Sequence, residues 1–166
     1  MDRSMESTDS AHTARLEWRD FQELAPDANA ALLTLSQAAA HHGFDKKTLE
    51  LVKLRISQIN ACSFCVAWHV SAAARLGVPP EKLHTLPVWR GMSAFDERER
   101  AALAWAEAVT AIADGVPDEV YAQVRAVFSD RELALLTSAV VATNAWNRLC
   151  GAYRFTPPAI AQQAAA

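Results

Sequence analysis

The sequence predicts an all-α protein that forms one compact helical domain. Alanine supplies much of the 51% hydrophobic content and the chain has only 5 glycines, a composition that favours helix over strand. Apolar residues recur at helical spacing in several segments, and no segment shows the strict alternation of a half-buried strand. A length of 166 residues is enough for a single domain with its own core.

The two ends of the chain are expected to lie outside this domain. Residues 1–15 are polar and carry almost no apolar side chain, so we expect a disordered tail there. The helical domain is then expected over residues 16–155, followed by a C-terminal tail at 156–166. The domain should open with a short amphipathic segment that ends at Leu24.

The expected helices follow from apolar spacing and from start and stop residues. Pro26 and Gly43 delimit one helix, and the apolar residues Leu49, Val52 and Ile56 mark the next. The expected ranges are 26–42, 45–60, 63–76, 81–86, 96–113, 118–127 and 130–150. The spacing of Asp96 with Glu99, and of Ser129 with Glu132, predicts a capping box at the start of two of these helices.

Composition argues against several functional classes. A net charge of −3 does not provide the basic surface that nucleic-acid binding needs. No run of 18 or more apolar residues is present, so we expect no membrane span. The N-terminus lacks the apolar core of a signal peptide. Three cysteines in such a chain suggest a reducing cytoplasm, where a C-x-x-C pair indicates redox chemistry or metal binding.

The chemically distinctive residues are Cys62, Cys65 and His69, which fall on one face of the expected helix. Cys65 lies in the first helical turn, where the helix dipole favours the reactive thiolate. His69, one turn later, can exchange a proton with a thiol. If the preceding helix packs antiparallel, Glu50 can orient His69. Cys62 is placed to form a disulfide with Cys65, which suits a cycle of thiolate, sulfenic acid and disulfide.

This pattern resembles the alkylhydroperoxidase D and carboxymuconolactone decarboxylase superfamily, particularly its alkylhydroperoxidase core. The matching pattern is a glutamate, eleven residues, C-x-x-C, three residues and a histidine, here Glu50, Cys62, Cys65 and His69. The likeness covers about residues 20–155. It implies an all-α fold of the alkylhydroperoxidase D type and a homo-oligomer, commonly a dimer, trimer or hexamer.

The resemblance also implies an activity and roles for the four residues. The implied enzyme is a thiol-dependent peroxidase that has a hydroperoxide substrate, a dithiol or thioredoxin-like reductant, and no cofactor or metal. Cys65 would attack the peroxide, Cys62 would resolve the product, and Glu50 and His69 would relay the proton. Phe64 stands where characterised alkylhydroperoxidases can carry a histidine. The decarboxylase branch generally lacks the cysteine pair, so lactone decarboxylation is not expected.

Other interpretations stay open at this point. The same cysteine pair can serve a dithiol–disulfide carrier or sensor that has no peroxidase activity. A non-catalytic module can instead hold zinc through Cys62, Cys65, His69 and Cys150, although Cys150 alone is expected to be structural. Glu50 can simply pair with Lys53. Two features have no assigned role: Glu107, expected to line a cavity or to pair with Arg100 or Arg148, and the cluster of Asn144, Trp146 and Asn147.

Overall fold

The computed structural model describes residues 13–160, and this part of the chain contains helices and loops but no strand. The α-helices are α1 (Trp18–Leu24), α2 (Pro26–His41), α3 (Lys46–Ile59), α4 (Ser63–Arg75), α5 (Pro80–Thr85), α6 (Glu97–Thr110), α7 (Asp118–Val127) and α8 (Asp130–Tyr153), with the 3₁₀ helices η1 (Leu86–Gly91) and η2 (Ile112–Asp114). The predicted all-α fold class is confirmed, and the oligomer stays a prediction. The ends of the two expected tails, residues 1–12 and 161–166, lie outside the described residues.

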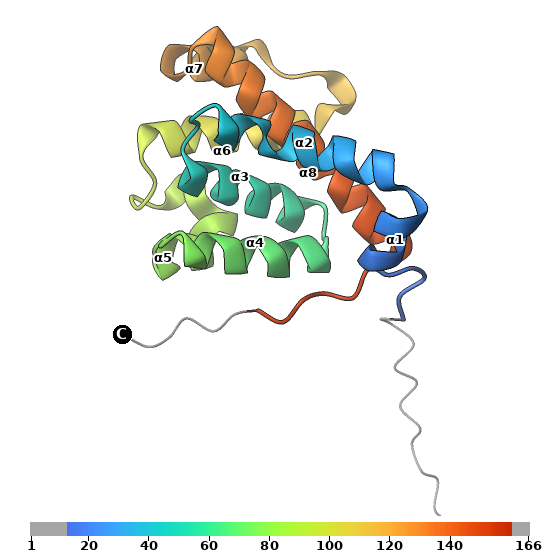
Figure 1. Ribbon diagram of the computed structural model, residues 1–166. Helices are drawn as coiled ribbons and strands as arrows, with labels where there is room; N and C mark the ends of the chain where they lie inside the picture. The colour runs from blue at the N-terminus through green and yellow to red at the C-terminus, as the bar shows by residue number, and fades with distance from the viewer. Residues whose placement is uncertain (1–12, 161–166) are drawn as a thin grey trace, which may run out of the picture.

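Helix α3 lies at the centre of the fold and packs against α4, α6 and α8 (Figure 1). Its apolar residues Leu49, Val52, Leu54 and Ile56 are almost completely buried. Ile59, at the last position of the helix, is 40% exposed, so the buried apolar stripe ends at Ile56. A helix covered on several sides by other helices is held rigidly, so its polar side chains have fixed positions.

Helix α8 is the longest helix and packs along α2 (Figure 1). It begins with the predicted capping box, in which Ser129 and Glu132 satisfy each other's backbone N–H groups, and α6 begins with the same device at Asp96 and Glu99. Helix α8 continues to Tyr153, three residues beyond the predicted end, and stops where Arg154 adopts a left-handed conformation. None of the helices in residues 13–160 has the length and apolarity that crossing a bilayer requires.

A second, smaller core lies at the C-terminal end of α8. It contains Phe21 of α1, Phe155 and the three cysteines of the chain, all of them buried. The chain segments on either side of the domain close over this core. The Arg15 N–H donates to the carbonyl of Tyr153 at 2.8 Å, and the Thr156 hydroxyl donates to Glu17 at 2.6 Å. These contacts place the cysteines in an apolar environment close to the domain surface.

Candidate active site

A two-residue turn, Asn60-Ala61, separates α3 from the Cys62 N-cap of α4 and folds the two helices against each other. Two backbone hydrogen bonds close the turn, from the Cys62 N–H to the Ser57 carbonyl and from the Ala61 N–H to the Gln58 carbonyl, at 3.0 and 3.1 Å. This is the Schellman arrangement, in which the residue after the cap adopts a left-handed conformation. Ala61 adopts it with φ 50°, where glycine is the usual residue.

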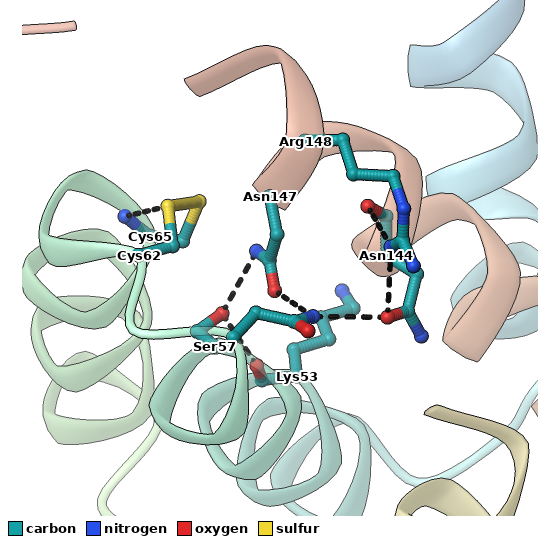
Figure 2. The surroundings of a disulfide bond; sticks show 8 residues. Lys53, Ser57, Cys62, Cys65, Asn144, Asn147 and Arg148 are labelled. Atoms are coloured by element: carbon teal, nitrogen blue, oxygen red, sulfur yellow. Dashed lines mark hydrogen bonds between the residues drawn. A yellow bond between two sulfur atoms is a disulfide. The ribbon is translucent and has the colours of Figure 1, made fainter. Parts of the chain in front are cut away.

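Amide side chains of α8 hold this turn in place (Figure 2). The Asn60 side-chain amide donates to both Asn144 and Asn147 at 2.9 Å, and the Asn147 amide donates to the Ser57 hydroxyl at 3.2 Å. Buried polar groups are costly unless they are paired, so these contacts specify how the end of α3 packs against α8. The asparagines left unassigned in the sequence therefore fix the backbone that presents Cys62.

Cys62 and Cys65 are joined by a disulfide at the start of α4, with their Cα atoms 5.4 Å apart (Figure 2). Cys62 is the N-cap of α4, and its sulfur accepts a hydrogen bond from the Cys65 N–H at 3.3 Å. Cys65 is in the first turn of α4, where the positive end of the helix dipole stabilises a thiolate. Both cysteines are buried.

Glu50 of α3 contacts both of the partners considered for it. Its Oε2 accepts from His69 Nδ1 at 2.8 Å, and its Oε1 accepts from Lys53 Nζ at 3.0 Å. Burial raises the pKa of Glu50, but the hydrogen bond and charge of His69, together with Lys53, outweigh burial and lower that pKa to about 2. Glu50 is therefore a carboxylate at neutral pH. It orients the imidazole through Nδ1 and leaves Nε2 as the nitrogen that can exchange a proton.

Cys65, Glu50, Lys53 and His69 line one cavity of about 220 Å³. Aromatic side chains form much of the rest of its wall. Four come from three helices: Trp18 of α1, Phe64 and Trp68 of α4, and Trp146 of α8. Trp18 contacts Phe64 and Trp68 edge to face, while Phe64 and Trp68 stack on each other. The cavity therefore combines an apolar wall with the charged or polar side chains of Glu50, His69 and Lys53 and the sulfur of Cys65.

Cys62 lines a second cavity and is not among the residues that line the cavity of Cys65 and His69. Its cavity has a volume of about 240 Å³ and is also lined by Arg154 and Phe155. Cys62 is the N-cap of α4, with an extended backbone at φ −86° and ψ 96°, so the periodicity of a continuous helix does not describe its position. The cysteine pair therefore separates two cavities, with Cys65 on one side and Cys62 on the other.

Cys150 of α8 lies beside the disulfide. The sulfurs of Cys62, Cys65 and Cys150 all lie within 4.8 Å of one another, and burial raises the pKa of Cys150 to about 12. No spacing in the sequence links Cys150 to the C-x-x-C pair, so a purely structural role was expected for it. The zinc set that also includes His69 does not form among the described residues, because His69 is bonded to Glu50 and is not part of the sulfur group.

Glu107 forms a separate, partly buried ion cluster and does not line either cavity. Its carboxylate accepts from Arg55 at 2.6 Å and from Trp89 at 3.0 Å, and it also pairs with Arg90. The expected partners Arg100 and Arg148 were therefore wrong. Burial raises the pKa of Glu107, but these hydrogen bonds outweigh it and the pKa is lowered. This carboxylate ties α3, α6 and η1 together.

Sequence reasoning missed some residues that α1 and α2 contribute to the Cys65 cavity. Trp18 and Ser36 line it, and Ser36 accepts a hydrogen bond from Trp146 Nε1 at 3.0 Å. Helix α1 packs on α2, and Trp18 at its start reaches Phe64 and Trp68 of α4. No local spacing signal encodes that contact.

These features define a class: an all-α protein of the alkylhydroperoxidase D type with a paired-cysteine site. The carboxymuconolactone decarboxylase family model matches residues 26–108, and the chain belongs to this family. YdfG of Bacillus subtilis, whose function is uncharacterised, is 30% identical over 78% of this chain and 88% of its own length.

Solved structures share the fold. A protein of unknown function from Agrobacterium tumefaciens, proposed to be the antioxidant defence protein AhpD, superposes with a TM-score of 0.81 at 35% identity, covering 88% of this chain and 99% of that one. The debrominase Bmp8 has a TM-score of 0.75 at 19% identity, covering 84% of this chain and 75% of its own. A peroxidase-related protein from Ralstonia eutropha has a TM-score of 0.73 at 20% identity, covering 84% and 75%. The last two show the fold alone.

Proposed function

We propose that this protein is a thiol-dependent peroxidase that reduces hydroperoxides, with Cys65 as the attacking thiol and Cys62 as the resolving thiol. The observation that supports the proposal most is the composition of one cavity. Cys65 lies there beside Glu50 and His69, which are hydrogen-bonded at 2.8 Å, and it can close a disulfide with Cys62. A nucleophile, an oriented proton donor and a resolving group are the parts that peroxide reduction by a thiol needs.

The oxidative half-reaction follows from these parts. The Cys65 thiolate attacks the terminal peroxide oxygen, the O–O bond breaks, and the leaving alkoxide takes a proton from His69 to become an alcohol. Cys65 is then a sulfenic acid. The Cys62 thiol condenses with it, which forms the disulfide and releases water. Glu50 stabilises the protonated imidazole and keeps it in one orientation, as a carboxylate does in other acid–base pairs.

The reductive half-reaction needs a dithiol, either a small dithiol or a thioredoxin-like protein. One of its thiolates attacks a sulfur of the Cys62–Cys65 disulfide and forms a mixed disulfide, and its second thiol releases the reduced enzyme. Such a cycle suits the reducing cytoplasm, which we infer as the compartment. The Cys62 cavity, which Cys65 and His69 do not line, offers the reductant access without entry into the peroxide cavity.

Stopped-flow fluorescence tests the proposal, because three tryptophans line the Cys65 cavity. Reduced protein is mixed with hydrogen peroxide and, separately, with cumene hydroperoxide. We expect both to change the fluorescence in a second-order reaction, and the aromatic hydroperoxide to react at least about tenfold faster because it buries its ring against the aromatic wall. The same protein unfolded in urea gives the rate for unassisted cysteines. If the folded protein reacts no faster than the unfolded one with either peroxide, the proposal is wrong.

A dithiol–disulfide carrier is the second candidate, and the separate cavity at Cys62 favours it. A carrier would exchange rapidly with a protein disulfide and show no folded-state acceleration with peroxide. The same instrument distinguishes the two candidates when insulin or oxidised thioredoxin replaces the peroxide.

A further inference from the structure

The sulfur of Cys150 lies close to the two sulfurs of the Cys62–Cys65 disulfide. All three sulfurs lie within 4.8 Å of one another, whereas Cys62 and Cys65 are adjacent on one turn and Cys150 comes from α8, 85 residues after Cys65. A disulfide requires sulfurs about 2.05 Å apart. Rotation of the cysteine side chains between staggered χ1 rotamers displaces each sulfur enough to account for a gap of this size.

Cys150 is also the cysteine that lines both cavities. Cys65 contributes to the wall of the first cavity and Cys62 to the wall of the second, but Cys150 contributes to each. Cys150 is therefore a wall residue that the two cavities share. A bond between Cys65 and Cys150 would leave the Cys62 thiol free at the second cavity, with no rearrangement of the α3–α4 turn implied.

The surroundings of Cys150 make it a slow nucleophile. It is packed among Phe21, Phe155 and other apolar side chains, and burial raises its pKa to about 12. A thiol that is protonated at neutral pH does not scramble the resting disulfide, because only the thiolate attacks. Cys150 is therefore expected to react with Cys65 only when Cys62 has not already done so.

We propose that Cys150 is a third redox-active thiol, which forms a disulfide with Cys65 when Cys62 is unavailable. In the peroxide reaction, which rests on the proposed function, the Cys65 sulfenic acid condenses with the Cys150 thiol; the S–O bond breaks, an S–S bond forms, and the hydroxyl leaves with the thiol proton as water. The pairing protects Cys65 from oxidation to sulfinic acid, which is irreversible in most proteins.

The Cys62→Ser variant tests this inference. Serine is a good N-cap residue, so the variant keeps the start of α4 and is expected to fold. The reduced variant is treated in EDTA with cumene hydroperoxide and, in a parallel sample, with diamide, which oxidises thiol pairs without a sulfenic acid. Non-reducing peptide mass spectrometry then locates the bonds, and dimedone traps any sulfenic acid. We expect a Cys65–Cys150 disulfide with both oxidants, and its formation from the sulfenic acid should accelerate as pH rises from 6 to 8 because the thiolate fraction of Cys150 grows.

The double variants Cys62→Ser/Cys150→Ala and Cys62→Ser/Cys150→Ser are the matched controls, and both should accumulate the dimedone adduct and sulfinic acid on Cys65. If peroxide leaves Cys62→Ser unreacted but diamide still joins Cys65 to Cys150, the proposed function fails and this inference stands. A persistent sulfenic acid on Cys65 beside a free Cys150 overturns the inference. The absence of the Cys65–Cys150 bond with both oxidants also overturns it, as does a bond between two chains in its place.

Discussion

Replacement of Cys65 by serine is expected to slow peroxide-dependent turnover by at least about 1,000-fold, because a hydroxyl cannot replace the thiolate as nucleophile. The change removes one buried sulfur and adds an oxygen of similar shape at the first turn of α4, so the fold should persist. Turnover is measured as consumption of cumene hydroperoxide with a dithiol reductant in excess. Circular dichroism and thermal unfolding of the variant check that the protein is folded.

The matched control for this variant is Ser138→Ala, which removes an exposed hydroxyl that bonds only the Ala134 carbonyl of α8. It should turn over peroxide at the wild-type rate. If Cys65→Ser retains more than a tenth of the wild-type rate while Cys62→Ser or Cys150→Ala does not, the attacking thiol has been assigned to the wrong cysteine. If all three variants turned over peroxide at the wild-type rate, thiol catalysis would be contradicted.

Replacement of Glu50 by glutamine is expected to lower the rate of Cys65 oxidation about 100-fold, within the range that general acid–base groups contribute. Glutamine keeps the shape of the side chain but loses the charge that stabilises protonated His69 across 2.8 Å. Because Glu50 acts through His69, the pH dependence of the rate should shift as well, which a purely structural role would not produce. Stopped-flow oxidation between pH 5 and 9 measures both effects.

Glu107→Gln is the control for the loss of a partly buried carboxylate with cationic partners. Glu107 pairs with Arg55 and Arg90 and lines neither cavity, so this variant should lose stability and keep the rate and pH profile of Cys65 oxidation. If Glu107→Gln slows Cys65 oxidation as much as Glu50→Gln does, the effect is a general loss of structure and the assigned role of Glu50 is wrong.

The Glu50 variant should also change how stability depends on pH. The pKa of Glu50 is about 2 in the folded protein and close to 4.5 once unfolded, so the ionised carboxylate contributes stability above pH 4.5 that is lost as pH falls towards 2. The lowered pKa corresponds to about 3 kcal/mol of unfolding free energy at neutral pH. The difference between wild type and Glu50→Gln in urea unfolding should therefore be largest at pH 7 and shrink steadily below pH 5.

The contact between Glu50 and His69 was predicted on the condition that the two helices pack antiparallel, with Lys53 as the other candidate partner, and the structure contains both contacts. Stop signals at Asn60-Ala61 and two amphipathic helices predict an antiparallel pair, and an antiparallel pair brings residues 50 and 69 together. The capping boxes at Asp96 and Ser129 were equally local and were found where expected. Such features depend on spacing within a few helical turns, which a sequence displays directly.

The features that the sequence did not predict depend on packing between distant segments. Cys150 lies next to the disulfide because α8 packs on the α3–α4 turn, and no local spacing encodes that contact. Trp18 lines the cavity because its ring contacts Phe64 and Trp68, which lie about 50 residues further along the chain. The side of the disulfide that Cys62 faces depends on its extended N-cap backbone, whereas helical periodicity assumes a continuous helix. The ion pair between Glu107 and Arg55, which are 52 residues apart, likewise depends on packing between distant helices.

The products of a single turnover show directly whether Cys65 and Cys62 reduce a hydroperoxide. Fully reduced protein is mixed with one equivalent of cumene hydroperoxide under anaerobic conditions, and the alcohol, the free thiols and the disulfide-linked peptides are quantified together. We expect one cumyl alcohol and one Cys62–Cys65 disulfide per chain within minutes of mixing, with Cys150 still a free thiol. Unconsumed hydroperoxide with all three thiols intact would contradict it.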